Sequence, residues 1–285
     1  MNAPSSHARR EAIPAVPACS TGSVPGAGRA VIAAVMIAAL SYSLVLPVLP
    51  QLAATAALPI DTTTGWLMGS YTVAALLASP WWGLAVDRRG ARLCLMVALV
   101  GQTAALGLLL FTPSWTTLLV HRVLQGSLGA GVVPAALVWM TQDPESDDAA
   151  ALGVARITRA SLLGGLAGPF LGGVLSRGND LSGVIAATAV LAALALIPLV
   201  RSRPATRRAA TNEPRSSASQ PWRIVVLLAL SAAAAAIMGA SEVGVAVRGR
   251  AVVGLTSAEL GLMFSGCGVV MIAVQTVLFR PGRAL

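Results

Sequence analysis

Residues 162–173 read LLGGLAGPFLGG, and this stretch decides what kind of fold the chain can adopt. Five of its twelve residues are glycine and one is proline, although glycine costs about 1 kcal/mol and proline about 3 kcal/mol relative to alanine inside a helix. Apolar residues surround it, in a run long enough to cross a bilayer. In lipid the backbone must bond within its own helix, and helices associate through close backbone contact. The stretch therefore predicts a packing face on a transmembrane helix.

The composition predicts a membrane protein throughout. Of the 285 residues, 56% are hydrophobic and only 11% are charged, whereas about a quarter are charged in soluble domains. The net charge of +9 comes entirely from arginine, mostly in short gaps between apolar runs, as in polytopic membrane proteins. Nucleic acid is therefore not an expected partner. The three cysteines lie far apart and show no disulfide or metal-ligand spacing, so no metal site and no cofactor is expected.

Apolar runs divide the chain into about eight expected membrane spans. They lie near residues 30–50, 64–86, 92–112, 116–140, 152–175, 181–200, 223–246 and 258–279. We expect a disordered cytoplasmic tail over 1–28, a six-helix N-terminal bundle over 29–200, a cytoplasmic linker over 201–222 and an incomplete two-helix bundle over 223–285. The alternation of arginine-rich and arginine-free gaps predicts a cytoplasmic N terminus in the plasma membrane.

The fourth span contains an arginine that the bilayer should disfavour. The stretch LLVHRVLQGSLGAG covers residues 118–131, and Arg122 lies several residues inside the expected boundary. Burying an arginine in a span costs at least about 2.5 kcal/mol. Gln125, Gly126 and Gly129 follow at i+3, i+4 and i+7, on the same helical face. We expect Arg122 to face the protein interior, with snorkelling to the interface as the alternative.

Two further titratable residues lie within expected spans. His121 is the only histidine inside a span, and it is either a neutral, locally packed side chain or a proton carrier, because its ordinary pKa lies nearest the working pH. Glu242 is the only acid expected within a span. It is either an interfacial residue in contact with water or part of a proton or substrate pathway.

The first span ends in LSYSLVLPVLP, residues 40–50. Pro47 and Pro50 are expected to shape the exit of the helix, because proline removes a backbone donor and fixes φ. Tyr42 lies between two serines and is a candidate for a cavity-facing residue.

The glycines of the fifth span recur every four residues in two series, which are Gly164, Gly168 and Gly172, and Gly165, Pro169 and Gly173. Both series predict a smooth stripe along the helix that admits a neighbouring backbone. Proline removes one helical hydrogen bond and permits a bend. The stripe is either a static packing face or a sliding and bending interface.

The turn between the second and third spans carries charge at the membrane edge. It reads GLAVDRRGARL from Gly83, which should let a helix approach, through Asp87, Arg88, Gly90 and Arg92. Gly90 allows a tight turn. The segment is either a hydrophilic turn that follows the positive-inside rule or a charge latch that forms and breaks between conformations.

Four of these segments together resemble the major facilitator superfamily. The segment GLAVDRRGAR resembles the loop between helices two and three, LLVHRVLQGSLGA the fourth-helix motif, and GGLAGPFLGG the fifth-helix antiporter motif. LSYSLVLPVLP resembles the first-helix motif of the twelve-helix drug:proton antiporters, with serine where glycine is usual.

The resemblance implies a secondary exporter of small amphipathic compounds or drugs that uses the proton gradient by alternating access. It implies that Asp87, Arg88 and Arg92 stabilise the outward-facing state, that Arg122 takes part in proton transfer, and that the 164–173 stripe governs bending and leak-tightness. Enzymatic activity is not expected, since the spans hold no paired acids, HExxH or GxSxG.

The expected eight spans are fewer than the twelve of that family. Either the chain is a truncated product or it needs a partner chain, and both remain open. The alternative function is that of a non-transporting membrane protein or interaction module. The expected partners of a transporter are a small molecule, protons and the lipid bilayer, with the chain itself monomeric or joined to a partner chain.

Overall fold

A computed structural model describes residues 26–53, 59–110, 114–141, 147–176, 182–201 and 221–278. These residues form helices and their connections, with no strand among them. Most of the expected tail (1–28) and linker (201–222) lies outside the described residues. The first helix begins at Gly26, so the last three residues assigned to a disordered tail are helical instead.

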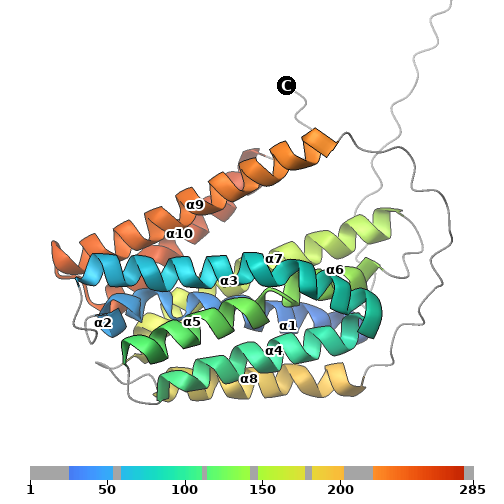
Figure 1. Cartoon of the computed structure of the whole chain (residues 1–285), viewed down its shortest axis with the longest axis horizontal. Coiled ribbons are helices and arrows are strands. Elements are labelled where there is room, and N and C mark those ends of the chain that lie inside the picture. The colour runs from blue at the N-terminus through green and yellow to red at the C-terminus, as the bar shows by residue number, and fades with distance from the viewer. Residues whose placement is uncertain are drawn as a thin grey trace, which may run out of the picture.

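The helices confirm an all-α architecture of about eight membrane spans (Figure 1). They are α1 (Gly26–Ser43), η1 (Leu46–Val48), α2 (Leu49–Ala53), α3 (Ile60–Arg89), α4 (Ala91–Gly107), η2 (Leu108–Leu110), α5 (Trp115–Gly129), α6 (Val132–Thr141), α7 (Asp147–Leu175), α8 (Ser182–Arg201), α9 (Pro221–Ala251) and α10 (Ser257–Leu278). Among the described residues, length and composition alone identify three stretches able to cross a membrane: Gly26–Val48, Trp115–Thr141 and Ser257–Val274. Ala91–Gly107 and Ile185–Arg201 are shorter apolar helices.

The first expected span is broken near its end, where the prolines lie. The α-helix ends at Ser43, and a 3-10 turn with Pro47 in its first positions leads into the short helix α2, which contains Pro50. Because Pro47 has no N–H, it cannot donate to the carbonyl of Ser43. The two prolines therefore shape the exit of this span, as expected.

The fourth expected span is also broken, which the apolar pattern did not predict. Between α5 and α6 the Gly131 N–H bonds the Leu128 carbonyl at 3.4 Å, rather than that of Ser127 as in an α-helix. The freed Ser127 carbonyl accepts a hydrogen bond of 2.7 Å from Trp82 Nε1 of α3. A Cβ at Gly131 would overlap the Trp82 ring, so glycine permits the indole to fill the break.

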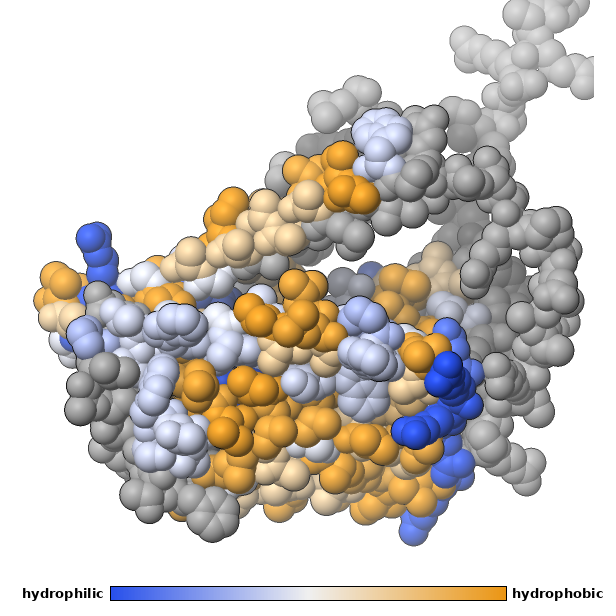
Figure 2. Space-filling model, viewed as in Figure 1, coloured by the Kyte–Doolittle hydropathy of each residue, from blue (hydrophilic) through white to orange (hydrophobic). Residues whose placement is uncertain are grey.

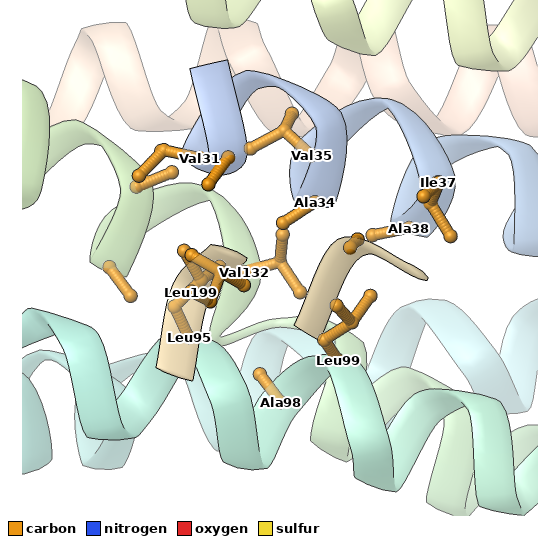
Figure 3. Packing of buried hydrophobic residues seen from close by; sticks show 14 of the residues in the cluster. Val31, Ala34, Val35, Ile37, Ala38, Leu95, Ala98, Leu99, Val132 and Leu199 are labelled. Atoms are coloured by element: carbon orange, nitrogen blue, oxygen red, sulfur yellow. The ribbon is translucent and has the colours of Figure 1, made fainter. Parts of the chain in front are cut away.

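The main core lies among α1, α4, α6 and α8 (Figure 3). Ala34 and Ala38 of α1 lie on the side of the helix that faces Leu99 of α4, and Leu95 of α4 lies beside Leu199 of α8. Alternating small and large side chains lets these helices interdigitate at high density. This core fixes α1, the helix that carries Tyr42, against the rest of the N-terminal helices.

The helices α9 and α10 form a hairpin that diverges from the other helices toward one end (Figure 1). Its turn contains Gly254 at φ +74°, a conformation that favours glycine. Thr256 and Glu259 form a capping box at the start of α10: the Thr256 N–H donates to Glu259 Oε2 at 2.7 Å, and the Glu259 N–H donates to Thr256 Oγ1 at 3.3 Å. The hairpin turn is thus well defined by local chemistry.

Figure 2 shows a broad apolar surface around the middle of the helices and hydrophilic residues gathered at their ends. Exposed side chains of this band include Trp66, Leu76, Leu77 and Trp81 of α3, each more than 60% exposed. Monomeric soluble proteins seldom expose an apolar surface of this extent, and lipid tails would cover it in a bilayer.

Candidate functional site

A cavity of about 570 Å³ lies between α1 and α7 on one side and α9 and α10 on the other. Its walls are mostly apolar, with a few polar groups from different helices: Tyr42 and Ser43, Ser161, and Ser241 and Glu242. Ligand sites of membrane and soluble proteins commonly combine apolar walls with a few placed polar groups. The cavity is the main candidate for a binding site among the described residues.

Arg122 is fully buried in α5, and two residues that line the cavity, Tyr42 and Glu242, interact electrostatically with it. Its Nη1 donates to Gln125 Oε1 at 2.9 Å, and its Nη2 lies 4.0 Å from Met68 Sδ. Gln125 in turn donates from Nε2 to the Ser41 carbonyl at 3.3 Å. The side chain thus faces the interior, and it does not snorkel to the interface. A charge without a carboxylate in hydrogen-bond contact is costly to bury, so it needs a functional or electrostatic reason.

The electrostatic environment of Arg122 supplies part of that reason. Coulombic interactions link its guanidinium with Tyr42, Tyr71 and Glu242. The two tyrosine rings stack with centroids 4.6 Å apart and planes tilted by 34°. Glu242 is half-buried and lines the cavity. Cavity and buried cation therefore share Tyr42 and Glu242.

Two glycines of α5 allow the helices around Arg122 to lie close together. A Cβ at Gly126 would overlap the Tyr71 carbonyl, and one at Gly129 would lie 3.0 Å from Gln102 Oε1. These two positions, four and seven residues after Arg122, allow α5 to lie close to α3 and α4.

His121 faces the opposite direction, toward α4. It is 1% exposed, and its Nδ1 lies 2.9 Å from the Ala105 carbonyl. A carbonyl can only accept, so Nδ1 carries the proton and donates. Nε2 has no hydrogen-bond partner among the described residues. The structure does not bring His121 into the cavity, and its geometry matches the neutral, locally packed alternative.

The glycine stripe of α7 consists of two faces with different neighbours. Cβ atoms at Gly164 or Gly168 would overlap oxygens of α1, and one at Gly172 would overlap the carbonyl of Leu44, which directly follows α1. Ser43 Oγ of α1 also donates to the Gly164 carbonyl at 3.3 Å. The second series turns toward α10, where a Cβ at Gly173 would overlap the Ser257 carbonyl.

This second face of α7 stays in close contact with α10 as far as Leu166, and beyond that point the two helices are separated by the cavity. The Pro169 carbonyl lies where a Cβ of Gly261 would be, and Ser265 Oγ donates to the Leu166 carbonyl at 2.8 Å. At Gly165, in contrast, a Cβ would meet nothing within 4 Å, and this residue lines the cavity. One stripe in the sequence is therefore two interfaces, one with α1 and one with α10 and the cavity.

The expected charge latch is only partly assembled in this structure. Gly90 adopts φ +87°, as a tight turn requires. Arg92 donates from Nε to the Leu199 carbonyl at 3.1 Å and from Nη2 to the Val200 carbonyl, so it caps the C-terminal end of α8. Among the described residues, the side chains of Asp87 and Arg88 form no hydrogen bond or ion pair. The close helix approach expected at Gly83 is absent too, since a Cβ there meets no described atom within 4 Å.

Three residues of this region were missed by the sequence interpretation. Tyr71 stacks on Tyr42, and Gln102 donates from Nε2 to the Ala38 carbonyl at 2.7 Å. Trp82 donates to the Ser127 carbonyl that is left free at the break before α6. An amide inside an apolar span was a signal for Gln102. Nothing in the spacing of Tyr71 or Trp82 distinguishes them from interfacial aromatic residues.

Comparison with known proteins agrees with this architecture. The family model of the Major Facilitator Superfamily matches residues 31–283. Multidrug resistance protein MdtG of Rahnella sp. (strain Y9602) is 29% identical over 161 residues, which cover 55% of this chain and 39% of that protein. The MdtG protein of Escherichia coli (strain K12 / DH10B) is 31% identical over 153 residues, covering 52% of this chain and 37% of that protein. The chain thus matches well under half the length of these curated relatives.

Two solved transporters share the fold at low sequence identity. One is a bacterial homolog of the human lysosomal transporter Spinster, with a TM-score of 0.69, 17% identity, and coverage of 92% of this chain and 66% of that chain. The other is the D-xylose-proton symporter, with a TM-score of 0.61, 13% identity, and coverage of 88% and 68%. With the family model matching nearly all described residues, the chain belongs to the major facilitator superfamily of multi-pass membrane transporters.

Proposed function

We propose that the chain takes part in secondary active transport, exporting small amphipathic compounds in exchange for protons. One observation carries the proposal: a fully buried arginine interacts electrostatically with two residues, Tyr42 and Glu242, that line a mostly apolar cavity between two groups of helices. Intramembrane charges are expensive and mark ion or substrate pathways by default. The multidrug resistance proteins among the relatives support the substrate class, and the D-xylose-proton symporter among the structural neighbours supports proton coupling.

The cavity chemistry suits an amphipathic substrate. Its long apolar walls would bind an apolar body, while Glu242 and the hydroxyl of Tyr42 would bind a polar or cationic group. Glu242 is also the acid that interacts electrostatically with Arg122. A proton on Glu242 would weaken both of these interactions, and its release would restore them. Competition between substrate and proton at this carboxyl is the proposed basis of exchange.

The two groups of helices are the proposed moving parts, with residues 29–200 in one and 223–285 in the other. The α7 face against α10 would be the interface at which they rock, and the 164–172 face would hold α1 to α7. In this proposal the N terminus is cytoplasmic, and Asp87 and Arg88 engage a partner only in another conformation.

The decisive experiment uses the full chain in proteoliposomes. A pH gradient is imposed, and both the uptake of ethidium, a lipophilic cation, and the movement of protons are followed by fluorescence. Arg122→Gln is compared with Arg159→Gln, which removes the same charge from an exposed position on α7. We expect substrate-dependent proton flux in the parent and in Arg159→Gln, and its loss in Arg122→Gln.

Two results would contradict the proposal in different ways. Equal flux in Arg122→Gln and the parent would remove the buried cation from the mechanism. Absence of flux in a well-inserted, monodisperse parent would support the alternative of a non-transporting membrane protein or interaction module.

A further inference from the structure

The α10 wall of the cavity carries sulfur at regular intervals. Met263, Cys267 and Met271 are spaced four residues apart, which places them on one helical face, and all three line the cavity. Met238 of α9 lines it as well. The lining residues from α1, η1 and α7 include no methionine or cysteine. Sulfur is thus confined to the wall contributed by α9 and α10.

These sulfur side chains are accessible from the cavity rather than packed in a core. Met238 is 53% exposed and Met271 39% exposed, and Cys267 is a free, exposed thiol. The other free cysteine of the described residues, Cys94, is buried. An exposed thiol with a thioether one turn away differs chemically from an ordinary apolar wall, because both groups are soft donors.

Helical geometry favours one pair within this row. Long side chains on an α-helix lean toward its N-terminal end, so each covers the turn before its own Cα. Met271 therefore leans over the turn that holds Cys267, whereas Met263 leans away from it. Cβ atoms four residues apart are about 5–6 Å apart, and two sulfurs on opposite sides of one ion, with bonds of about 2.3 Å as in zinc thiolates, would be about 4.6 Å apart. A flexible methionine side chain spans the difference.

We propose that Cys267 and Met271 form a binding site for a soft, thiophilic monovalent metal ion, of the Cu(I) class, in the wall of the cavity. Thiolate and thioether donors select Cu(I) over hard cations. Among the described residues there is no group of three or more histidine, cysteine, aspartate or glutamate side chains able to hold a metal, so this pair does not resemble a zinc or calcium site. Binding releases the thiol proton of Cys267 to water as the sulfur–metal bond forms, with no change of oxidation state.

The proposal is tested by metal binding to the purified full chain in detergent, with Ag⁺ as a probe that needs no reductant. All proteins carry Cys19→Ser, so that the cysteine outside the described residues does not contribute. Isothermal titration is compared for the parent, Cys267→Ser, Met271→Leu and Met263→Leu. Cys94→Ser and Met96→Leu are the matched controls, because they remove a thiol and a thioether from the N-terminal helices. None of these readouts requires transport, so they are independent of the proposed function.

We expect one Ag⁺ per chain in the parent. Loss of a residue that only hydrogen-bonds a metal ligand typically lowers metal affinity about 10–100-fold. Loss of a direct ligand, in Cys267→Ser or Met271→Leu, should therefore lower the affinity for Ag⁺ by at least about tenfold. Met263→Leu and both controls should stay within about twofold of the parent. X-ray absorption of the loaded chain should show at least two sulfur neighbours.

Two outcomes would overturn the site. If Met271→Leu binds Ag⁺ as tightly as the parent and absorption shows a single sulfur, the thiol merely reacts alone and the methionines are an adaptable apolar wall. If Cys94→Ser removes the binding instead, the ion lies in the N-terminal helices.

Discussion

The two faces of α7 allow a matched prediction, because neighbouring glycines on one helix have opposite surroundings. A Cβ at Gly165 would meet nothing within 4 Å, whereas a Cβ at Gly168 would lie 2.8 Å from the Leu40 carbonyl oxygen and 2.9 Å from the Leu44 nitrogen. Both contacts involve backbone atoms, which cannot rotate away. Ordinary Cβ contacts begin at 3.4 Å, so Gly168→Ala requires α1 and α7 to move apart.

The magnitude follows from comparing the two alanine variants. Each gains the same helix propensity, about 1 kcal/mol in water, and this gain cancels in the difference. What remains is the strain of inserting a methyl group into a tightly packed interface, typically about 1–3 kcal/mol. Separation would also lengthen the 3.3 Å bond from Ser43 Oγ to the Gly164 carbonyl. We therefore expect Gly168→Ala to be less stable than Gly165→Ala by about 1–3 kcal/mol.

The assay is thermal unfolding of the purified full chain in one detergent, followed by circular dichroism. The ranking should be Gly165→Ala at or above the parent and Gly168→Ala below it, and leucine at the same two positions should widen the gap. Equal midpoints for the two alanine variants would refute the reasoning, because they would mean that α1 does not contact α7 at Gly168.

Two further matched pairs test other contacts by the same measurement. Trp82→Phe should destabilise the protein by about 1–3 kcal/mol, because it leaves the Ser127 carbonyl without its donor. The control Trp81→Phe changes a side chain that is 73% exposed and should leave the midpoint unchanged. The reverse ranking would contradict the account of the helix break. Gln102→Met should cost about 1 kcal/mol and speed hydrogen exchange at the end of α1, because it removes the donor to the Ala38 carbonyl. The control Thr103→Val loses only a bond within its own helix, so equal exchange in the two variants would count against a role for Gln102 in holding α1.

Relations within one helix could be predicted from the sequence, because the helical repeat alone determines them. Arg122 and Gln125 are three residues apart and form a hydrogen bond, and Gly126 lies on the same face against α3. The approximate positions of the helices follow from the apolar runs, but the breaks inside the first and fourth expected spans do not.

Relations between helices could not be predicted, because the repeat does not say which neighbour each face meets. The two glycine series looked like one stripe, yet they contact α1 and α10 separately. Arg92 has the spacing of a latch residue but bonds the last carbonyls of α8. Trp82 can donate to the Ser127 carbonyl only because the helix is broken at Gly131. The indole in turn supplies the donor that this carbonyl loses at the break, so neither feature can be predicted without the other.

The asymmetry of α7 restricts where any rocking motion can occur. On the α1 face, oxygens of Met36, Ser43 and Leu44 lie where Cβ atoms of Gly164, Gly168 and Gly172 would be, and a hydrogen bond crosses between the helices. Separation there would lose close contact along three turns. On the α10 face, close contact runs from Gly173 to Leu166 and then ends at the cavity. A tilt of α10 about the Gly173 end would widen the cavity while the contact with Ser257 is kept. We therefore assign the proposed rocking motion to the α10 face, and in this proposal Tyr42 moves with α7 because α1 does.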